Sequence, residues 1–165
     1  MTPATPYLQL RALGPLDLDV AAALHGACFD EGWSAKTMGE ILAMPGCFAL
    51  LALADDEPAG LVIGLATGPE AEILVLGVVP SRRRRGIGRR LFAAAADRFI
   101  AQGVARLYLE VAEDNLSARS LYQSLGFVEH GRRPGYYRRA EGRVTALLLD
   151  LSLVTAGGGK SESQH

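Results

Sequence analysis

The stretch SRRRRGIGRRL, from Ser81 to Leu91, combines residue types that bind anions. Its six arginines supply positive charge, and Gly86 and Gly88 leave room for main-chain N–H groups to approach a phosphate closely. An apolar run precedes the stretch and helical spacing follows it, so the glycines fall at a helix N-terminus, where the helix dipole favours negative charge. This pattern favours a pyrophosphate-binding loop. Composition alone also allows a solvated basic loop that merely begins a helix.

Other nucleotide-binding and nucleic-acid-binding patterns fit less well. Gly86 and Gly88 supply only the first two glycines of a dinucleotide fingerprint, and no lysine follows them as a nucleoside-triphosphate loop requires. The whole chain has 17 Lys and Arg against 18 Asp and Glu, a net charge of −1, so the basic stretch is a local feature. We therefore expect no direct binding of nucleic acid.

Periodic apolar residues and turn residues predict the elements that position this loop. Strands are expected at 7–12, on both sides of a turn at 55–58 within 47–67, and at 71–79, 105–111, 127–133 and 144–153. Helices are expected at 16–28, from a Ser34 cap to about Pro45, at 91–103, and at 115–125 with Asn115 or Ser117 as its cap. A polar and aromatic loop is expected between the last two strands.

Length and composition limit the class of protein. The 165 residues, 49% of them apolar, predict one globular domain, which we place at residues 1–154, with a disordered tail at 155–165. Cys28 and Cys47 lack disulfide or zinc spacing, so we expect two core cysteines and no metal. No apolar run approaches the ~18 residues of a membrane span, and the N-terminus has no secretory pattern. We expect a cytoplasmic protein without a membrane partner.

The motifs resemble one known superfamily. Residues 83–88, RRRGIG, fit the [RQ]-x-x-G-x-[GA] acetyl-CoA loop of the GCN5-related N-acetyltransferases (GNAT), and LGVVPSRRRRGIGRRLF and LYLEVAEDNLSARSLYQSLGF look like consecutive blocks of it. LYQSLGF followed by RRPGYY, and GWS at 32–34, resemble the bacterial ribosomal-protein-alanine N-acetyltransferases. The similarity covers roughly 7–153. It implies the GNAT fold, an α/β (α+β) architecture with a mixed central sheet of about seven strands and about four helices.

The resemblance implies acetyl-CoA as co-substrate and assigns residues to its binding. The pyrophosphate falls on the arginine and glycine loop, the Val78 N–H polarises the thioester carbonyl, and Arg82 and Arg90 are left to solvent. The implied cofactor-binding residues are Leu76, Gly77, Val78, Arg83, Arg84, Arg85, Gly86, Ile87, Gly88, Arg89 and Asn115.

The resemblance also assigns a general base, Glu110, and a general acid, Tyr122. Chemistry agrees, because an α-amine titrates near ~8 and needs a modest base, while a phenol near ~10 can protonate a departing thiolate. Without the resemblance, Glu110 would be interpreted as a solvent-facing strand carboxylate and Tyr122 as a core aromatic residue.

The acceptor side carries the weaker signal. Trp33, Tyr136 and Tyr137 could line a peptide groove or simply pack. Gly135 stands where the family often has asparagine, and Val144-Thr145 where it often has an acidic pair. We expect acetylation of a protein N-terminal α-amine, such as that of a small-subunit ribosomal protein. The alternatives are a small-molecule amine as acceptor, or a non-catalytic acetyl-CoA-binding or RNA-binding module. His25 and His130 are expected to be structural.

Overall fold

The structure, a computed structural model, describes residues 7–153. The strands are β1 (Leu8–Ala12), β2 (Cys47–Ala54), β3 (Glu57–Thr67), β4 (Glu70–Val78), β5 (Arg106–Ala112), β6 (Val128–Arg139) and β7 (Gly142–Ser152). The α-helices are α1 (Leu18–Cys28), α2 (Ala35–Leu42), α3 (Ile87–Ala101) and α4 (Leu116–Ser124), and short 3₁₀ turns are η1 (Pro15–Asp17) and η2 (Pro80–Arg82). The tail expected at 155–165 lies outside the described residues.

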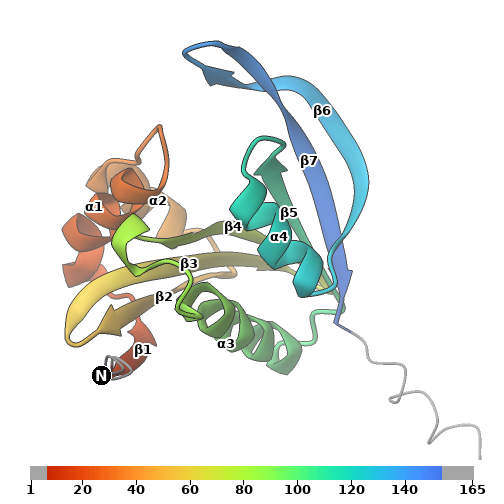
Figure 1. The fold of residues 1–165 in the computed structure, drawn as a ribbon. Helices are drawn as coiled ribbons and strands as arrows, with labels where there is room; N and C mark the ends of the chain where they lie inside the picture. The colour runs from red at the N-terminus through yellow and green to blue at the C-terminus, as the bar shows by residue number, and fades with distance from the viewer. Residues whose placement is uncertain (1–6, 154–165) are drawn as a thin grey trace, which may run out of the picture.

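One seven-stranded mixed sheet organises the molecule, in the order β1-β2-β3-β4-β5-β7-β6 (Figure 1). Every neighbouring pair is antiparallel except β4 and β5, which are parallel. The β6 and β7 hairpin extends beyond the rest of the sheet. The expected fold class, a mixed sheet with four helices, is confirmed.

Two apolar cores lie on opposite faces of the sheet, because successive strand side chains alternate between faces. On one face α3 and α4 pack through Leu91, Phe99 and Tyr122 against strand residues such as Leu109. On the other face α1 and α2 pack against the sheet, with residues such as Met38 in that core. The cofactor loop and the segment around Trp33 therefore lie on different sides of the sheet.

The local signals act where the sequence places them. The turn between β2 and β3 has Asp55 and Asp56 at positive φ, as a tight hairpin requires. Ser34 Oγ accepts a hydrogen bond from the Thr37 N–H at the start of α2, and Asn115, rather than Ser117, caps α4. No helix within residues 7–153 is long and apolar enough to cross a membrane.

The expected loop at 134–143 is wrong, because β6 continues to Arg139 and includes Tyr136 and Tyr137. Pro134 and Gly135 suggested a loop, but β6 is the edge strand of the sheet, where proline and a bulge are tolerated. The register shifts between Arg133 and Tyr137, and Gly135 has φ +61° there. The strand thus bends at Gly135 and then resumes its pairing with β7.

Candidate active site

The central gap of the sheet arises where β4 and β5 diverge. Their pairing covers only three positions, from Glu70 opposite Arg106 to Glu72 opposite Tyr108. Beyond Glu72, an irregularity in the β3–β4 register falls at Leu74, and such bulges bend a strand. The second half of β4 consequently has no strand neighbour on its β5 side.

Backbone groups of β4 point into this gap. The Val79 N–H donates to the Ala59 carbonyl of β3 at 2.9 Å. Because consecutive N–H groups of a strand point to opposite sides, the Val78 N–H points away from β3, toward the gap. The Val78 carbonyl lies on that side too, where it accepts a hydrogen bond from Arg83 Nε at 2.9 Å.

A cavity of about 970 Å³ occupies the gap between β4, α3 and α4. Ten of the eleven predicted cofactor-binding residues line it: Leu76, Gly77, Val78, Arg83, Arg84, Gly86, Ile87, Gly88, Arg89 and Asn115. Arg85 does not belong to its wall. Sequence reasoning missed Ser117, Ser120, Leu121 and Ser124, which also line it and whose helical spacing on α4 was the available signal.

The loop before α3 presents unpaired amides to this cavity. Arg84 and Gly86 adopt positive φ, +65° and +82°, and the first amide of α3 with a helical acceptor is that of Arg90, bonded to the Gly86 carbonyl at 3.0 Å. Within the described chain, the N–H groups of residues 84–89 have no hydrogen-bond acceptor. Such a row of free amides at a helix N-terminus is suited to a phosphate group.

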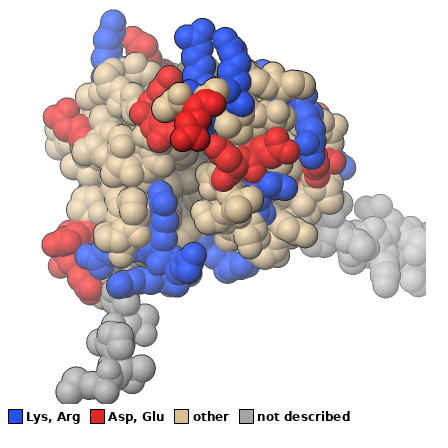
Figure 2. Space-filling view, turned by 45° about the horizontal axis from the view of Figure 1, so that its top comes forward, with Lys and Arg blue, Asp and Glu red and all other residues tan. Residues whose placement is uncertain are grey.

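The arginines of the loop have different surroundings. Arg82, expected to be left to solvent, pairs with Glu57 at 3.1 Å, approaches Asp55, and borders the cavity. Arg89 donates to Ser124 Oγ at 2.7 Å and so joins α3 to α4. Figure 2 shows basic side chains along the lower edge of one face and also at its top, with acidic ones across its upper middle and at its lower left, so both signs of charge are spread over this face of a nearly neutral protein.

Tyr122 lies on the cavity wall and is 7% exposed. Its ring packs edge to face on Phe127 at 5.5 Å. Burial, and then the nearby Tyr137, raise the pKa of the Tyr122 hydroxyl above its ordinary value, so this group keeps its proton at neutral pH. Its hydroxyl has no partner within residues 7–153 and is free to bond a ligand.

Glu110 is not part of the cavity wall. It alternates along β5 with Leu109 and Val111, which belong to the core under α3 and α4, so its side chain lies on the opposite face of the sheet. Arg133 of β6 forms an ion pair with Glu110 at 3.2 Å. Glu72 lies near both: burial first, and then the Glu110 charge, raise the pKa of Glu72.

The aromatic residues expected at the acceptor side are placed around Glu110 and the loop after α1. Tyr136 is half exposed, and the Arg133 guanidinium lies over its ring at 5.2 Å. Burial, followed by the Glu110 charge, raises the pKa of Tyr137. Trp33 is partly buried against the core under α1 and α2, where it stacks on His25. None of the three lines the 970 Å³ cavity.

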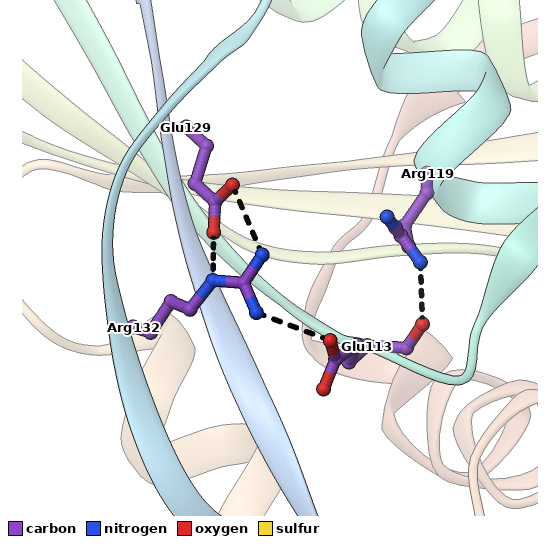
Figure 3. Close-up of polar contacts among 4 residues, drawn as sticks. All are labelled: Glu113, Arg119, Glu129 and Arg132. Carbon is purple, nitrogen blue, oxygen red and sulfur yellow. Dashed lines mark hydrogen bonds and ion pairs between the residues drawn. The ribbon is translucent and has the colours of Figure 1, made fainter.

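Ion pairs hold the segments around the site together, and sequence reasoning did not find them. Arg132 of β6 bonds both Glu129 and Glu113, and Arg119 donates to the Glu113 carbonyl at 2.8 Å, which fixes the turn between β5 and α4 (Figure 3). Arg139, at the end of β6, bridges Asp114 of that turn at 3.3 Å and Asp30 of the loop after α1 at 3.6 Å.

Two sequence expectations about cysteines and histidines can be compared with the structure. Cys28 and Cys47 are both partly buried. Cys47 packs against the core under α1 and α2, as expected, whereas Cys28 at the end of α1 faces the cavity, which corrects its placement in the core. His25 is buried and hydrogen-bonded, as expected of a structural histidine. Within residues 7–153, no group of three His, Cys, Asp or Glu side chains is arranged to hold a metal ion.

Comparison with known proteins gives consistent matches. The model of the acetyltransferase (GNAT) family matches residues 18–127. The chain is 38% identical to the ribosomal protein bS18-alanine N-acetyltransferase of Salmonella typhimurium over 86% of this chain and 95% of that protein. It is 36% identical to the N-alpha-acetyltransferase RimI of Mycobacterium tuberculosis over 84% and 89% of the two chains.

The solved structures agree at the level of the fold. The crystal structure of the ribosomal-protein-S18-alanine N-acetyltransferase from Escherichia coli matches with a TM-score of 0.85 and 29% identity, covering 93% of this chain and 98% of that one. Arabidopsis thaliana NAA60, in complex with acetyl-CoA, has a TM-score of 0.78 at 20% identity, over 88% of this chain and 98% of that chain.

Proposed function

The chain belongs to the GNAT acetyltransferase family, and from this premise we propose that it transfers the acetyl group of acetyl-CoA to the N-terminal α-amine of a protein. A small-subunit ribosomal protein is the proposed acceptor, because relatives such as the one from Salmonella typhimurium are named for alanine acetylation of ribosomal protein bS18. The reaction class follows from the family. The acceptor and the roles of individual residues are our proposal.

One observation carries the proposal: a single cavity has free backbone amides at one end and a buried tyrosine on its wall. The unpaired N–H groups of residues 84–89 are suited to the pyrophosphate of acetyl-CoA. Arg83, Arg84 and Asn115 border the same cavity and supply further donors. Arg85, outside the wall, is assigned only the charge it adds near the loop.

The gap in the sheet connects the two substrates. Acetyl-CoA supplies an activated acetyl thioester when it is bound. The Val78 N–H points into the gap from β4 and is the proposed donor to the thioester carbonyl. The acceptor amine enters from the other face of the sheet, where Glu110 and its neighbours lie.

Two side chains are proposed to move protons. Glu110 accepts the proton of the attacking amine, directly or through one water, and its ion pair with Arg133 keeps the carboxylate oriented. Tyr122 returns a proton to the departing thiolate. The position of Tyr122 on the cavity wall supports this role. Burial raises the pKa of its hydroxyl, which keeps the group protonated at neutral pH and also makes it a weaker acid than a free phenol.

The acceptor entrance is proposed to lie between the loop after α1 and the bend of β6. Trp33 borders it on one side, and Tyr136 and Tyr137 border it on the other. Tyr137 lies close enough to Glu110 for the carboxylate charge to raise the Tyr137 pKa. We expect small first residues to be preferred, since a large side chain beside the thioester would displace the amine, and about 1 Å of misplacement can cost ~100-fold in rate.

A small cationic amine is the second candidate acceptor. A cavity of about 190 Å³ is lined by Glu70, Glu72 and Tyr108 with apolar neighbours, and its carboxylates would attract a polyamine. Glu72 lies opposite Tyr108 in the β4–β5 register, two residues before Glu110 on β5, and the Glu110 charge contributes to the raised pKa of Glu72. The observation favours a cationic group near the site, on a metabolite or on a basic peptide side chain.

A panel of acceptors tests the proposal. Purified protein and acetyl-CoA are incubated with an alanyl peptide, with the same peptide blocked at its α-amine but carrying lysine, and with spermidine, and products are measured by mass spectrometry. We expect the free alanyl peptide to react fastest. Faster reaction of spermidine or of the blocked peptide would overturn the acceptor assignment.

We also propose that the protein acts in the bacterial cytoplasm, because ribosomal proteins are made in that compartment.

A further inference from the structure

His25 is the buried polar side chain that the proposed reaction does not use. It is 4% exposed, within the last turns of α1. Its imidazole stacks on the Trp33 ring at 4.4 Å between centroids, and the Phe29 ring lies tilted against it at 4.7 Å. Two aromatic rings therefore enclose it, one from each end of the loop at residues 29–34.

The same residue also holds both ends of this loop by hydrogen bonds. The Phe29 N–H donates to the His25 carbonyl at 3.0 Å, where the loop leaves α1. The Trp33 N–H donates to His25 Nδ1 at 3.0 Å, just before the Ser34 cap of α2. Because Nδ1 accepts this bond, it carries no proton, and the imidazole is neutral.

The loop at residues 29–34 contacts both the cavity and β6, so its position matters for the proposed reaction. Phe29 lines the acetyl-CoA cavity and touches the edge of Gly77, where an added Cβ would lie 3.2 Å from its ring. Asp30 reaches across to Arg139 of β6. The loop thus stands between the cavity and the bend of β6, and a shift of Trp33 would alter the acceptor side of the gap.

We propose that His25 is a positioning residue for the acceptor: its unprotonated Nδ1 holds the Trp33 main chain and so fixes the loop 29–34 beside the entering amine. The acceptor part of this inference rests on the proposed function. The hydrogen bond is the decisive contact, because a stacked ring alone would leave the part-buried Trp33 N–H without this acceptor.

Two substitutions distinguish the effect of the His25 hydrogen bond from the effect of its stacked ring. His25→Phe keeps an aromatic ring in the stack and removes the acceptor, whereas His25→Asn places an amide oxygen near the position of Nδ1 and removes the ring. We expect His25→Phe to raise the KM for an alanyl peptide roughly tenfold, the equivalent of one lost hydrogen bond to a buried group, with the KM for acetyl-CoA little changed. His25→Asn should restore most of the peptide KM.

Trp33 is the single tryptophan of the chain, so its fluorescence reports the loop directly. Acrylamide quenching should increase in His25→Phe and stay near the wild-type value in His25→Asn. If His25→Phe does not fold, His25→Leu removes the same acceptor and serves in its place. Circular dichroism establishes that each variant is folded.

Three outcomes would overturn the proposal: an unchanged peptide KM in the acceptor-less variants, equal increases in both KM values, or a larger loss in His25→Asn than in His25→Phe. Failure of the wild-type protein to acetylate any α-amine would contradict the proposed function instead. In that case the quenching comparison still decides whether His25 holds the loop, since it needs no acceptor.

Discussion

Tyr122 and Glu110 approach the gap from different elements, Tyr122 from α4 and Glu110 from β5. Tyr122→Phe removes one oxygen from a buried ring, and Glu110→Gln removes a base at constant size. Each change should lower turnover by about 10²–10⁴, the range for general acid–base groups, with acetyl-CoA affinity little changed. Turnover is measured with an alanyl peptide and affinity by calorimetry.

Tyr108→Phe is the matched control for the tyrosine substitution. Tyr108 lies on β5 rather than on α4, and its hydroxyl approaches Glu70 at 3.5 Å, outside the proposed acetyl-CoA cavity. Its removal should leave turnover near the wild-type value. Full activity in Tyr122→Phe would mean that another group protonates the thiolate.

His25 also predicts how stability depends on pH. Burial lowers the pKa of His25 in the folded protein, whereas in the unfolded chain it titrates near ~6.5. As pH falls through that value, His25 binds a proton in the unfolded state but not in the folded state, so the free energy of unfolding decreases. Above that pH, the His25 side chain is neutral in both the folded and the unfolded state and adds no pH dependence to stability.

Urea unfolding between about pH 7.5 and 5.5 measures this effect. The wild-type midpoint should fall over this range, and the decline should be smaller in His25→Asn, which has no titrating group at this position. An identical slope in both proteins would show that the pH dependence comes from other residues.

At the scale of elements, the N-terminus of α3 is the proposed anion site. Gly86→Glu places a carboxylate at the start of this helix, where φ is +82° and no atom lies within 4 Å of an added Cβ. It should abolish acetyl-CoA binding, because the new charge repels the pyrophosphate and fills its space. Gly88→Glu should have the same effect. Binding is measured by calorimetry.

Gly103 provides a closely matched control. It follows the other end of α3, has φ +84°, and is equally open around its Cα. Gly103→Glu therefore introduces similar backbone strain and the same charge far from the cavity. Acetyl-CoA should bind it normally. Unchanged binding in folded Gly86→Glu would contradict the assignment of the loop.

Arg139 joins three segments around the acceptor entrance, through Asp30, Asp114 and the face of Tyr137 at 5.5 Å. Arg139→Gln should cost little stability, less than about 1 kcal/mol, because the pairs are near the surface. It should raise the peptide KM by loosening the loop 29–34, and added salt should raise the peptide KM of the wild type for the same reason.

Arg11→Gln is the control. It breaks the distant pair with Asp17 and should leave the peptide KM unchanged.

Local signals made most elements predictable from the sequence. The Ser34 cap, the Asp55-Asp56 turn and the glycines beside α3 act over a few residues, so they could be interpreted without the fold. β6 was not predictable beyond Arg133, because Pro134 and Gly135 have the composition of a loop, and only the edge position of the strand makes them acceptable there.

In the candidate site too, some features were predictable from the sequence and others were not. The amide cradle follows from contiguous residues, and the placement of Glu110 relies on strand alternation. The pairing of Glu110 with Arg133, and of Asp30 with Arg139, depends on long-range packing that no local pattern encodes. The role of His25 likewise needs the fold, since its partner Trp33 lies eight residues away across a loop.

At the scale of the whole molecule, our proposal places the two substrates on opposite faces of the sheet and lets them meet at its gap. The acetyl-CoA cavity lies between β4, α3 and α4, while Glu110 faces the side that carries α1 and α2 (Figure 1). In the proposed arrangement, a protein α-amine enters the gap from that side without crossing the cofactor. The central claim is therefore the choice of an α-amine over other amines.

A single peptide that carries both an N-terminal alanine and an internal lysine tests this claim most directly. The peptide is incubated with the protein and acetyl-CoA, and tandem mass spectrometry locates the acetyl group. We predict acetylation of the α-amine in the wild type and nearly none in Tyr122→Phe within the same time. Acetylation of the lysine in preference to the α-amine, or equal labelling of both, would contradict the proposed function.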